Sequence, residues 1–80
     1  MTIYYYAEAR EIARRLDEGG HTNEARSLIE AIETGATGTE ILMALRCNLQ
    51  RLEKANLPMN IEIRTQIRDL ITAISEVLGG

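Results

Sequence analysis

The sequence predicts an all-α protein: a compact four-helix domain with short loops, in which residues 1–80 form a single domain. Three observations support this. A chain of 80 residues has room for one small hydrophobic core. Hydrophobic residues make up 45% of it but aromatic residues only 4%, so the core must be aliphatic. Leucine and isoleucine recur at spacings of three and four, in stretches separated by glycine or proline, as in amphipathic helices.

The first half of the chain predicts two helices, at about residues 3–18 and 22–34. Each carries an apolar stripe. The stripe of the first helix is Tyr5, Ala9, Ile12, Ala13 and Leu16, and that of the second is Ala25, Leu28, Ile29 and Ile32. Gly19 and Gly20 should end the first helix, because glycine readily adopts the left-handed conformation. We expect Thr22 or Asn23 to cap the second helix, which Gly35 stops. The short connection makes the pair an antiparallel hairpin.

The second half predicts two longer helices, at about residues 38–56 and 60–78. The first has the most continuous apolar stripe in the middle of the chain, so we expect it to be the central helix. Thr37 and Glu40 have the spacing of a capping box at its start. We expect this helix to end just before Pro58, because the residue before a proline is pushed out of helical geometry. Asn60 should cap the last helix, whose stripe is Ile63, Ile67, Leu70, Ile71, Ile74 and Leu78.

Charge is distributed unevenly along the chain, whose net charge is −3. The stretch 17–40 holds one basic residue, Arg26, and six acidic residues: Asp17, Glu18, Glu24, Glu30, Glu33 and Glu40. We interpret these acids as a candidate surface for a basic protein partner, because complementary charge raises association rate and selectivity. The alternative is an ordinary solvated helix face with acids biased towards helix N-termini.

Several apolar side chains lie off the predicted core stripes. Met43 and Cys47 fall on the back of the third helix, and Ile3 and Tyr4 on the back of the first. We expect a protein interface there, with Tyr4, Met43 and Cys47 as candidates for self-association. The alternatives are a helix packed on both sides within the monomer, or scattered surface residues.

Arginine accounts for eight of the nine basic residues, and four arginines fall on the last two helices: Arg46, Arg51, Arg64 and Arg68. A nucleic-acid interface could be proposed there. However, Glu53, Glu62 and Asp69 are interspersed among them, and the chain is acidic overall. We therefore expect surface ion pairs, and nucleic acid is not the predicted partner.

The sequence contains no recognisable catalytic or metal-binding constellation. Its one histidine, His21, falls in a predicted turn and its one cysteine, Cys47, in the middle of a helix, so they do not pair as base and nucleophile. No cluster of Cys, His and carboxylates has metal-ligand spacing. We therefore expect no enzymatic activity, no cofactor and no metal. The single cysteine and the lack of a signal peptide or membrane span favour the cytoplasm.

The run TGTEILMALR, from Thr37 to Arg46, is followed by a second amphipathic helix after a proline. This arrangement resembles segments of the small helical immunity proteins that accompany bacterial polymorphic or contact-dependent toxins. The resemblance covers about half of the chain and carries over no individual binding residue. It implies a stoichiometric inhibitor that holds a toxin domain inactive in the producing cell.

Together these observations predict a non-catalytic protein-binding module. The leading hypothesis is an immunity or antitoxin-type inhibitor that binds a basic toxin domain through the acidic stretch 17–40. The alternative is a homodimeric structural or regulatory helical bundle of a bacterial cytoplasm. A third hypothesis is a nucleic-acid-associated regulator that uses the arginines of the last two helices.

Overall fold

The computed structural model describes residues 2–79, apart from the side chains of Thr2 and Ile3. It contains four helices: α1 (Thr2–Glu18), α2 (Thr22–Thr34), α3 (Gly38–Ala55) and α4 (Ile61–Leu78). Every boundary lies within one residue of its predicted position. The predicted fold class, an all-α four-helix domain with short loops, is therefore confirmed.

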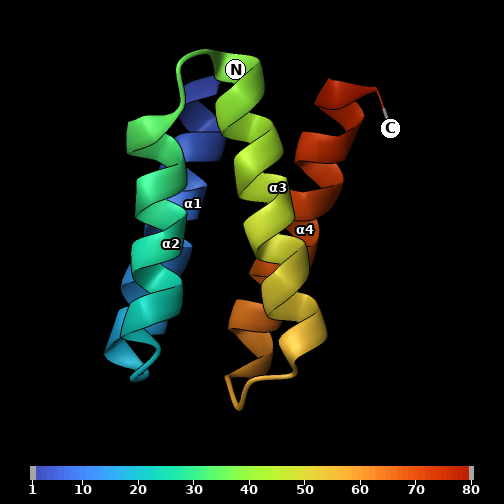
Figure 1. Ribbon diagram of the computed structural model, residues 1–80. Coiled ribbons are helices and arrows are strands. Elements are labelled where there is room, and N and C mark those ends of the chain that lie inside the picture. The colour runs from blue at the N-terminus through green and yellow to red at the C-terminus, as the bar shows by residue number, and fades with distance from the viewer. Residues whose placement is uncertain (1, 80) are drawn as a thin grey trace.

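Successive helices run in opposite directions, so α1 and α3 begin at the same end of the bundle (Figure 1). Both α1 and α3 pack mainly against α2 and α4, which leaves α1 and α3 diagonal to each other. The expectation of a central helix at residues 38–56 is therefore wrong, because α3 occupies one corner of the bundle. Four amphipathic stripes share a single core, and none needs to be surrounded by the other three.

The core runs along the middle of the bundle and is aliphatic. Its buried members are Ala9, Ile12, Ala13, Leu16, Ala25, Leu28, Ala31, Ile32, Leu42, Leu45, Leu49, Leu52, Ile67, Leu70 and Ile74. Four of these are alanines, all on α1 and α2, and small side chains allow two helices to approach closely. Tyr5 and Tyr6 are partly buried and pack against this core.

Two of the predicted helix caps are confirmed. The backbone N–H of Glu40 donates to the Thr37 hydroxyl oxygen at 3.1 Å, which fixes the start of α3. The backbone N–H of Glu62 donates to the Asn60 side-chain oxygen at 2.6 Å, at the start of α4. Helix α3 ends one residue earlier than predicted, because Asn56 adopts the left-handed conformation (φ 54°).

The predicted cap of α2 is wrong. The N-cap residue is His21, whose side chain makes no capping hydrogen bond, because the chain enters the helix early and Thr22 is already helical. The Thr22 hydroxyl donates instead to the Asp17 carboxylate at 2.9 Å. The His21 ring donates from Nε2 to the backbone carbonyl of Pro58 at 3.0 Å. His21 therefore ties the α1–α2 loop to the α3–α4 loop at one end of the bundle.

The glycines act in two different ways. Gly20 has a φ of 90°, so the predicted left-handed turn after α1 is confirmed. Gly35 ends α2 in an extended conformation (φ −71°) that any residue can adopt. A side chain is nevertheless excluded there, because a Cβ atom would overlap Cγ1 of Ile41 and lie 3.3 Å from its Cα. Gly35 thus permits the close turn from α2 into α3.

We predict that Gly35→Ala lowers the free energy of unfolding by about 1–3 kcal/mol, because the added methyl group overpacks against Ile41. The measurement is urea unfolding followed by circular dichroism. Gly19→Ala is the matched control: a Cβ atom at Gly19 meets its nearest atoms at 3.5 Å or more, so this variant should be at least as stable as the wild type. Equal stability of the two variants would show that Gly35 is not sterically constrained.

We also predict that His21→Leu lowers the free energy of unfolding by about 1 kcal/mol, because the Pro58 carbonyl loses its bond to the ring. Denaturant unfolding checks this prediction, with Asn23→Leu as a control at an exposed position in the first turn of α2. An unchanged midpoint for His21→Leu would mean that the link between the two loops adds nothing to stability.

Candidate protein-binding surfaces

Two of the six candidate acids, Asp17 and Glu18, lie at the C-terminal end of α1 and already have partners within the chain. Asp17 accepts a hydrogen bond from Thr22 at 2.9 Å. Glu18 Oε2 lies 2.7 Å from Arg14 Nη1 in an exposed ion pair. Because a side chain of this protein already binds each carboxylate, both attract a foreign cation less strongly.

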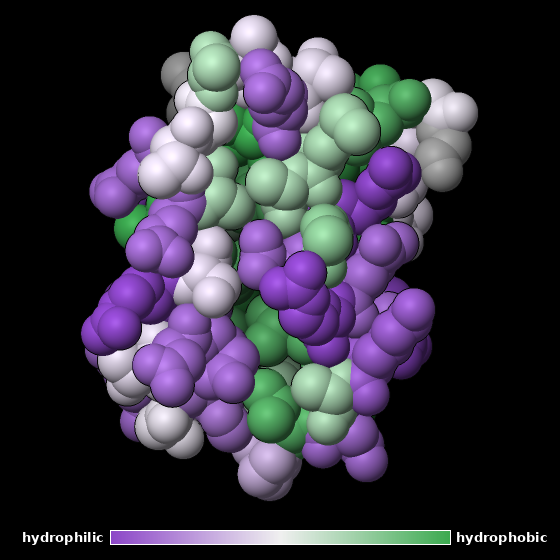
Figure 2. Space-filling view, in the orientation of Figure 1, coloured by the Kyte–Doolittle hydropathy of each residue, from purple (hydrophilic) through white to green (hydrophobic). Residues whose placement is uncertain are grey.

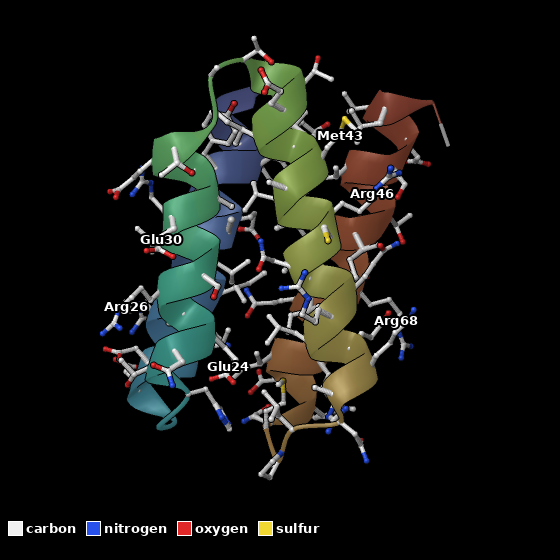
Figure 3. All side chains as sticks on the ribbon, viewed as in Figure 1. Glu24, Arg26, Glu30, Met43, Arg46 and Arg68 are labelled. Atoms are coloured by element: carbon white, nitrogen blue, oxygen red, sulfur yellow. The ribbon has the colours of Figure 1, made fainter. Side chains whose placement is uncertain are left out.

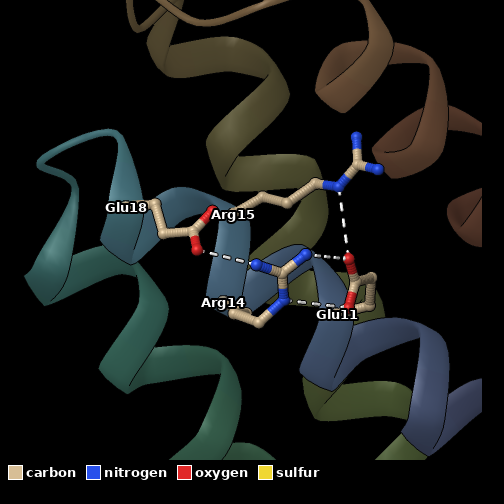
Figure 4. Close-up of polar contacts among 4 residues, drawn as sticks. All are labelled: Glu11, Arg14, Arg15 and Glu18. Atoms are coloured by element: carbon tan, nitrogen blue, oxygen red, sulfur yellow. Dashed lines mark hydrogen bonds and ion pairs between the residues drawn. The ribbon is translucent and has the colours of Figure 1, made fainter.

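Arg14 also binds Glu11, so these residues form a small network along α1 (Figure 4). Arg14 Nε lies 3.1 Å from Glu11 Oε1, and Arg15 Nε lies 3.3 Å from Glu11 Oε2. The hydrogen bond from Arg14 lowers the pKa of the Glu11 carboxyl, and Glu11 in turn raises the pKa of Arg14. With Glu18, the network contains two acids and two bases, so it presents little net charge to a partner.

Glu24 lies apart from these acids, in a groove between α2 and α3. In Figure 3 its side chain is on the side of α2 that faces α3. The groove has a volume of about 220 Å³ and is lined by Asn23, Glu24, Ser27, Asn48, Arg51, Leu52, Ala55 and Leu57. Figure 2 shows apolar atoms in a hollow of this face, with hydrophilic side chains on both sides. The groove thus combines an apolar floor with a carboxylate and a guanidinium on its walls.

The other three acids occupy two further places. Glu30 and Glu33, three residues apart, share the outer side of α2 and are both exposed. Figure 3 shows Glu30 on this helix with Arg26 one turn below it. Glu40 lies at the start of α3, where its carboxylate accepts from the Thr37 hydroxyl at 3.2 Å. The six acids are therefore distributed over several surfaces, and only Glu30 and Glu33 form a pair on open helix surface.

A second groove lies between α1 and α2, and neither groove was predicted from the sequence. It has a volume of about 350 Å³ and is lined by Arg10, Ala13, Arg14, Asp17, Thr22, Ala25, Arg26 and Ile29. Three arginines and one acid, Asp17, border it, and one of these arginines, Arg14, is already paired with Glu11 and Glu18. Arg10 and Arg14 are four residues apart on α1, a spacing that could have suggested a shared face. Arg26 joins them only through the packing of α2.

The self-association candidates are exposed but do not form one patch. Tyr4 is 56% exposed and Met43 52%, and Cys47 is also exposed. Tyr4 packs edge-on against Tyr5, with ring centroids 5.4 Å apart. Because α1 and α3 are diagonal, Tyr4 lies on a different side of the bundle from Met43 and Cys47. The side chain of Ile3, expected beside Tyr4, is outside the described part of the structure.

The high exposure of Met43 contradicts the alternative in which α3 is packed on both sides within the monomer. Two more exposed apolar side chains, Ile61 and Val77, lie near opposite ends of α4 and are 72% and 53% exposed. Both fall outside the apolar stripe of that helix, so a helical wheel could have identified them.

The four arginines considered for nucleic acid all contact other parts of this chain. Arg46 donates to Ser75 at 3.5 Å, Arg64 to the Leu57 carbonyl at 2.6 Å and Arg51 to the Cys47 sulfur at 3.6 Å. Arg68 forms an ion pair with Glu53 at 3.5 Å. Arg51 lines the α2–α3 groove, whereas Arg46 and Arg68 lie towards α4 (Figure 3). These arginines therefore do not form one basic face.

Within residues 2–79, no three His, Cys, Asp or Glu side chains are grouped so that they could hold a metal ion. His21 bonds to a backbone carbonyl, and Cys47 contacts Arg51. The two serines donate to, or accept from, other groups: Ser27 donates to the Asn23 carbonyl and Ser75 accepts from Arg46. None of the four helices, as far as the described residues extend, is long and apolar enough to span a membrane.

Comparisons of the chain with protein-family models, with curated proteins and with solved structures gave no match in any of the three. The resemblance to immunity proteins therefore stays a prediction.

Proposed function

We propose that this chain is a non-catalytic protein-binding module that neutralises a basic partner by stoichiometric binding. The outer side of α2 carries this proposal. Glu30 and Glu33 are exposed there, and neither takes part in any ion pair found within residues 2–79. Their helix packs against α1 and α3, so the two carboxylates are presented from a fixed backbone.

The partner that fits such a surface is a basic protein domain. A toxin domain covered by its immunity protein would be a partner of this kind. Two unpaired carboxylates one helical turn apart attract lysine and arginine side chains and raise the association rate. Arg26, on the same helix, repels positively charged groups placed against it. It therefore adds selectivity against polycations that do not match the pattern of charges on α2. A cytoplasmic module of this kind would act in the cell that produces the toxin.

We predict that Glu30→Lys/Glu33→Lys lowers association with the partner by about tenfold or more, because the surface changes sign. The tagged chain would be used to capture proteins from its native cell lysate at low and at high salt. The expected result is a basic protein that the wild type retains at low salt, and that both high salt and the double variant release.

The control for this prediction is Asp69→Lys/Glu76→Lys, which makes the same change in net charge at exposed positions on α4. This control should still capture the partner. Equal loss of binding in both double variants would show that overall charge, and not the outer side of α2, governs the association.

A second candidate function is a homodimeric structural or regulatory bundle, favoured by the exposure of Met43. We predict that Met43→Asp converts a dimer into a monomer, as measured by light scattering, because a carboxylate would be buried at the apolar contact. Helicity should not change, since the side chain is 52% exposed in the monomer.

Val77→Asp is the matched control for Met43→Asp, because Val77 is also about half exposed but lies on α4. This control should remain a dimer. If Met43→Asp has the same mass as a dimeric wild type, Met43 is not part of the interface. If the wild type is itself a monomer at high protein concentration, this second candidate fails.

A further inference from the structure

The groove between α2 and α3 lies directly beside an exposed ridge of α3, and Arg51 belongs to both. We propose that a second copy of this chain docks on this face, so that α3 of each copy packs against α2 of the other. The inference rests on self-association, the second candidate function above, and it names the surface used.

The groove is a partly apolar hollow that the chain's own side chains leave open. Leu52, Ala55 and Leu57 provide its apolar part, and the free volume is about 220 Å³. This volume can receive a few side chains, and is small for a drug-sized ligand. The polar residues Asn23, Ser27 and Asn48 line the same hollow. The size of the groove therefore favours protein side chains over a small molecule as its occupant.

The ridge consists of Met43, Cys47 and Arg51, spaced four residues apart along α3. Residues at this spacing form the rows that pack into the grooves of a neighbouring helix. Met43 is 52% exposed, Cys47 is exposed, and the Arg51 guanidinium lies 3.6 Å from the Cys47 sulfur. The row is thus continuous, and its first two members are apolar.

The charges of the groove point to a second copy as the occupant. Glu24 stands on the α2 wall and Arg51 on the α3 wall, and they form no ion pair with each other. A two-fold axis parallel to the helices preserves height along the bundle and exchanges the two walls. It therefore brings Arg51 of each copy next to Glu24 of the other. A purely basic partner would instead meet Arg51 with repulsion.

The test uses two single charge reversals, Glu24→Arg and Arg51→Glu, with the mass of each protein measured by light scattering. Each variant alone should dimerise about tenfold more weakly than the wild type or worse, because all the facing charges then have one sign. An equimolar mixture of the two should recover a dimer, since every contact in the heterodimer again joins opposite charges. Asp69→Arg, on α4, is the control and should dimerise like the wild type.

Recovery in the mixture, with weak dimerisation of each variant alone, supports the inference, because contacts within one chain cannot produce it. If the wild type is a dimer and neither reversal weakens it, the dimer uses another face and the inference is overturned. If the wild type is a monomer at high concentration, self-association itself fails. Binding of a basic partner through Glu30 and Glu33 is measured separately and is unaffected by either outcome.

Discussion

All four helices of this protein must bury their apolar stripes in one another, because each has a single such stripe and the buried residues of the described part of the chain form one core. The resulting core is made of leucine, isoleucine and alanine, and it contains no polar or charged residue among those described. Aliphatic packing of this kind is strong but has little directional preference. Helix caps, the close turn at Gly35 and the bond between His21 and Pro58 therefore specify where the helices begin and how the two hairpins are joined.

The elements of this fold were predictable from sequence because they depend on local chemistry. The caps at Thr37 and Asn60 each involve residues within three positions of each other, and both are present in the structure. The α2 cap was mispredicted because Thr22 turns back to Asp17, a contact that depends on the shape of the loop. The corner position of α3 was also missed, since it depends on how four helices pack together and not on the strength of one stripe.

The residues of the candidate surfaces could be identified from the sequence, but the way in which they are grouped on the surface could not. Glu24 and Glu30 belong to one helix and one acidic stretch, yet six residues of helix place them on different sides. Which neighbour covers each side follows from tertiary packing: α3 completes the groove at Glu24, whereas Glu30 stays on open surface. Tyr4 and Met43 are similarly separated because α1 and α3 are diagonal. Helix α2 thus has exposed carboxylates on its outer side and a groove on the side that faces α3.

The most direct test of the account is native mass spectrometry of the tagged chain, purified gently at low salt from the cells that produce it. If the chain acts through the surfaces of α2 and α3 described above, it acts through stoichiometric protein contacts. The expected result is therefore a complex of fixed composition, in which the chain is bound to a basic protein, to a second copy of itself, or to both. A bare monomer, with no protein bound under these conditions, would contradict the central claim that this chain functions by binding protein.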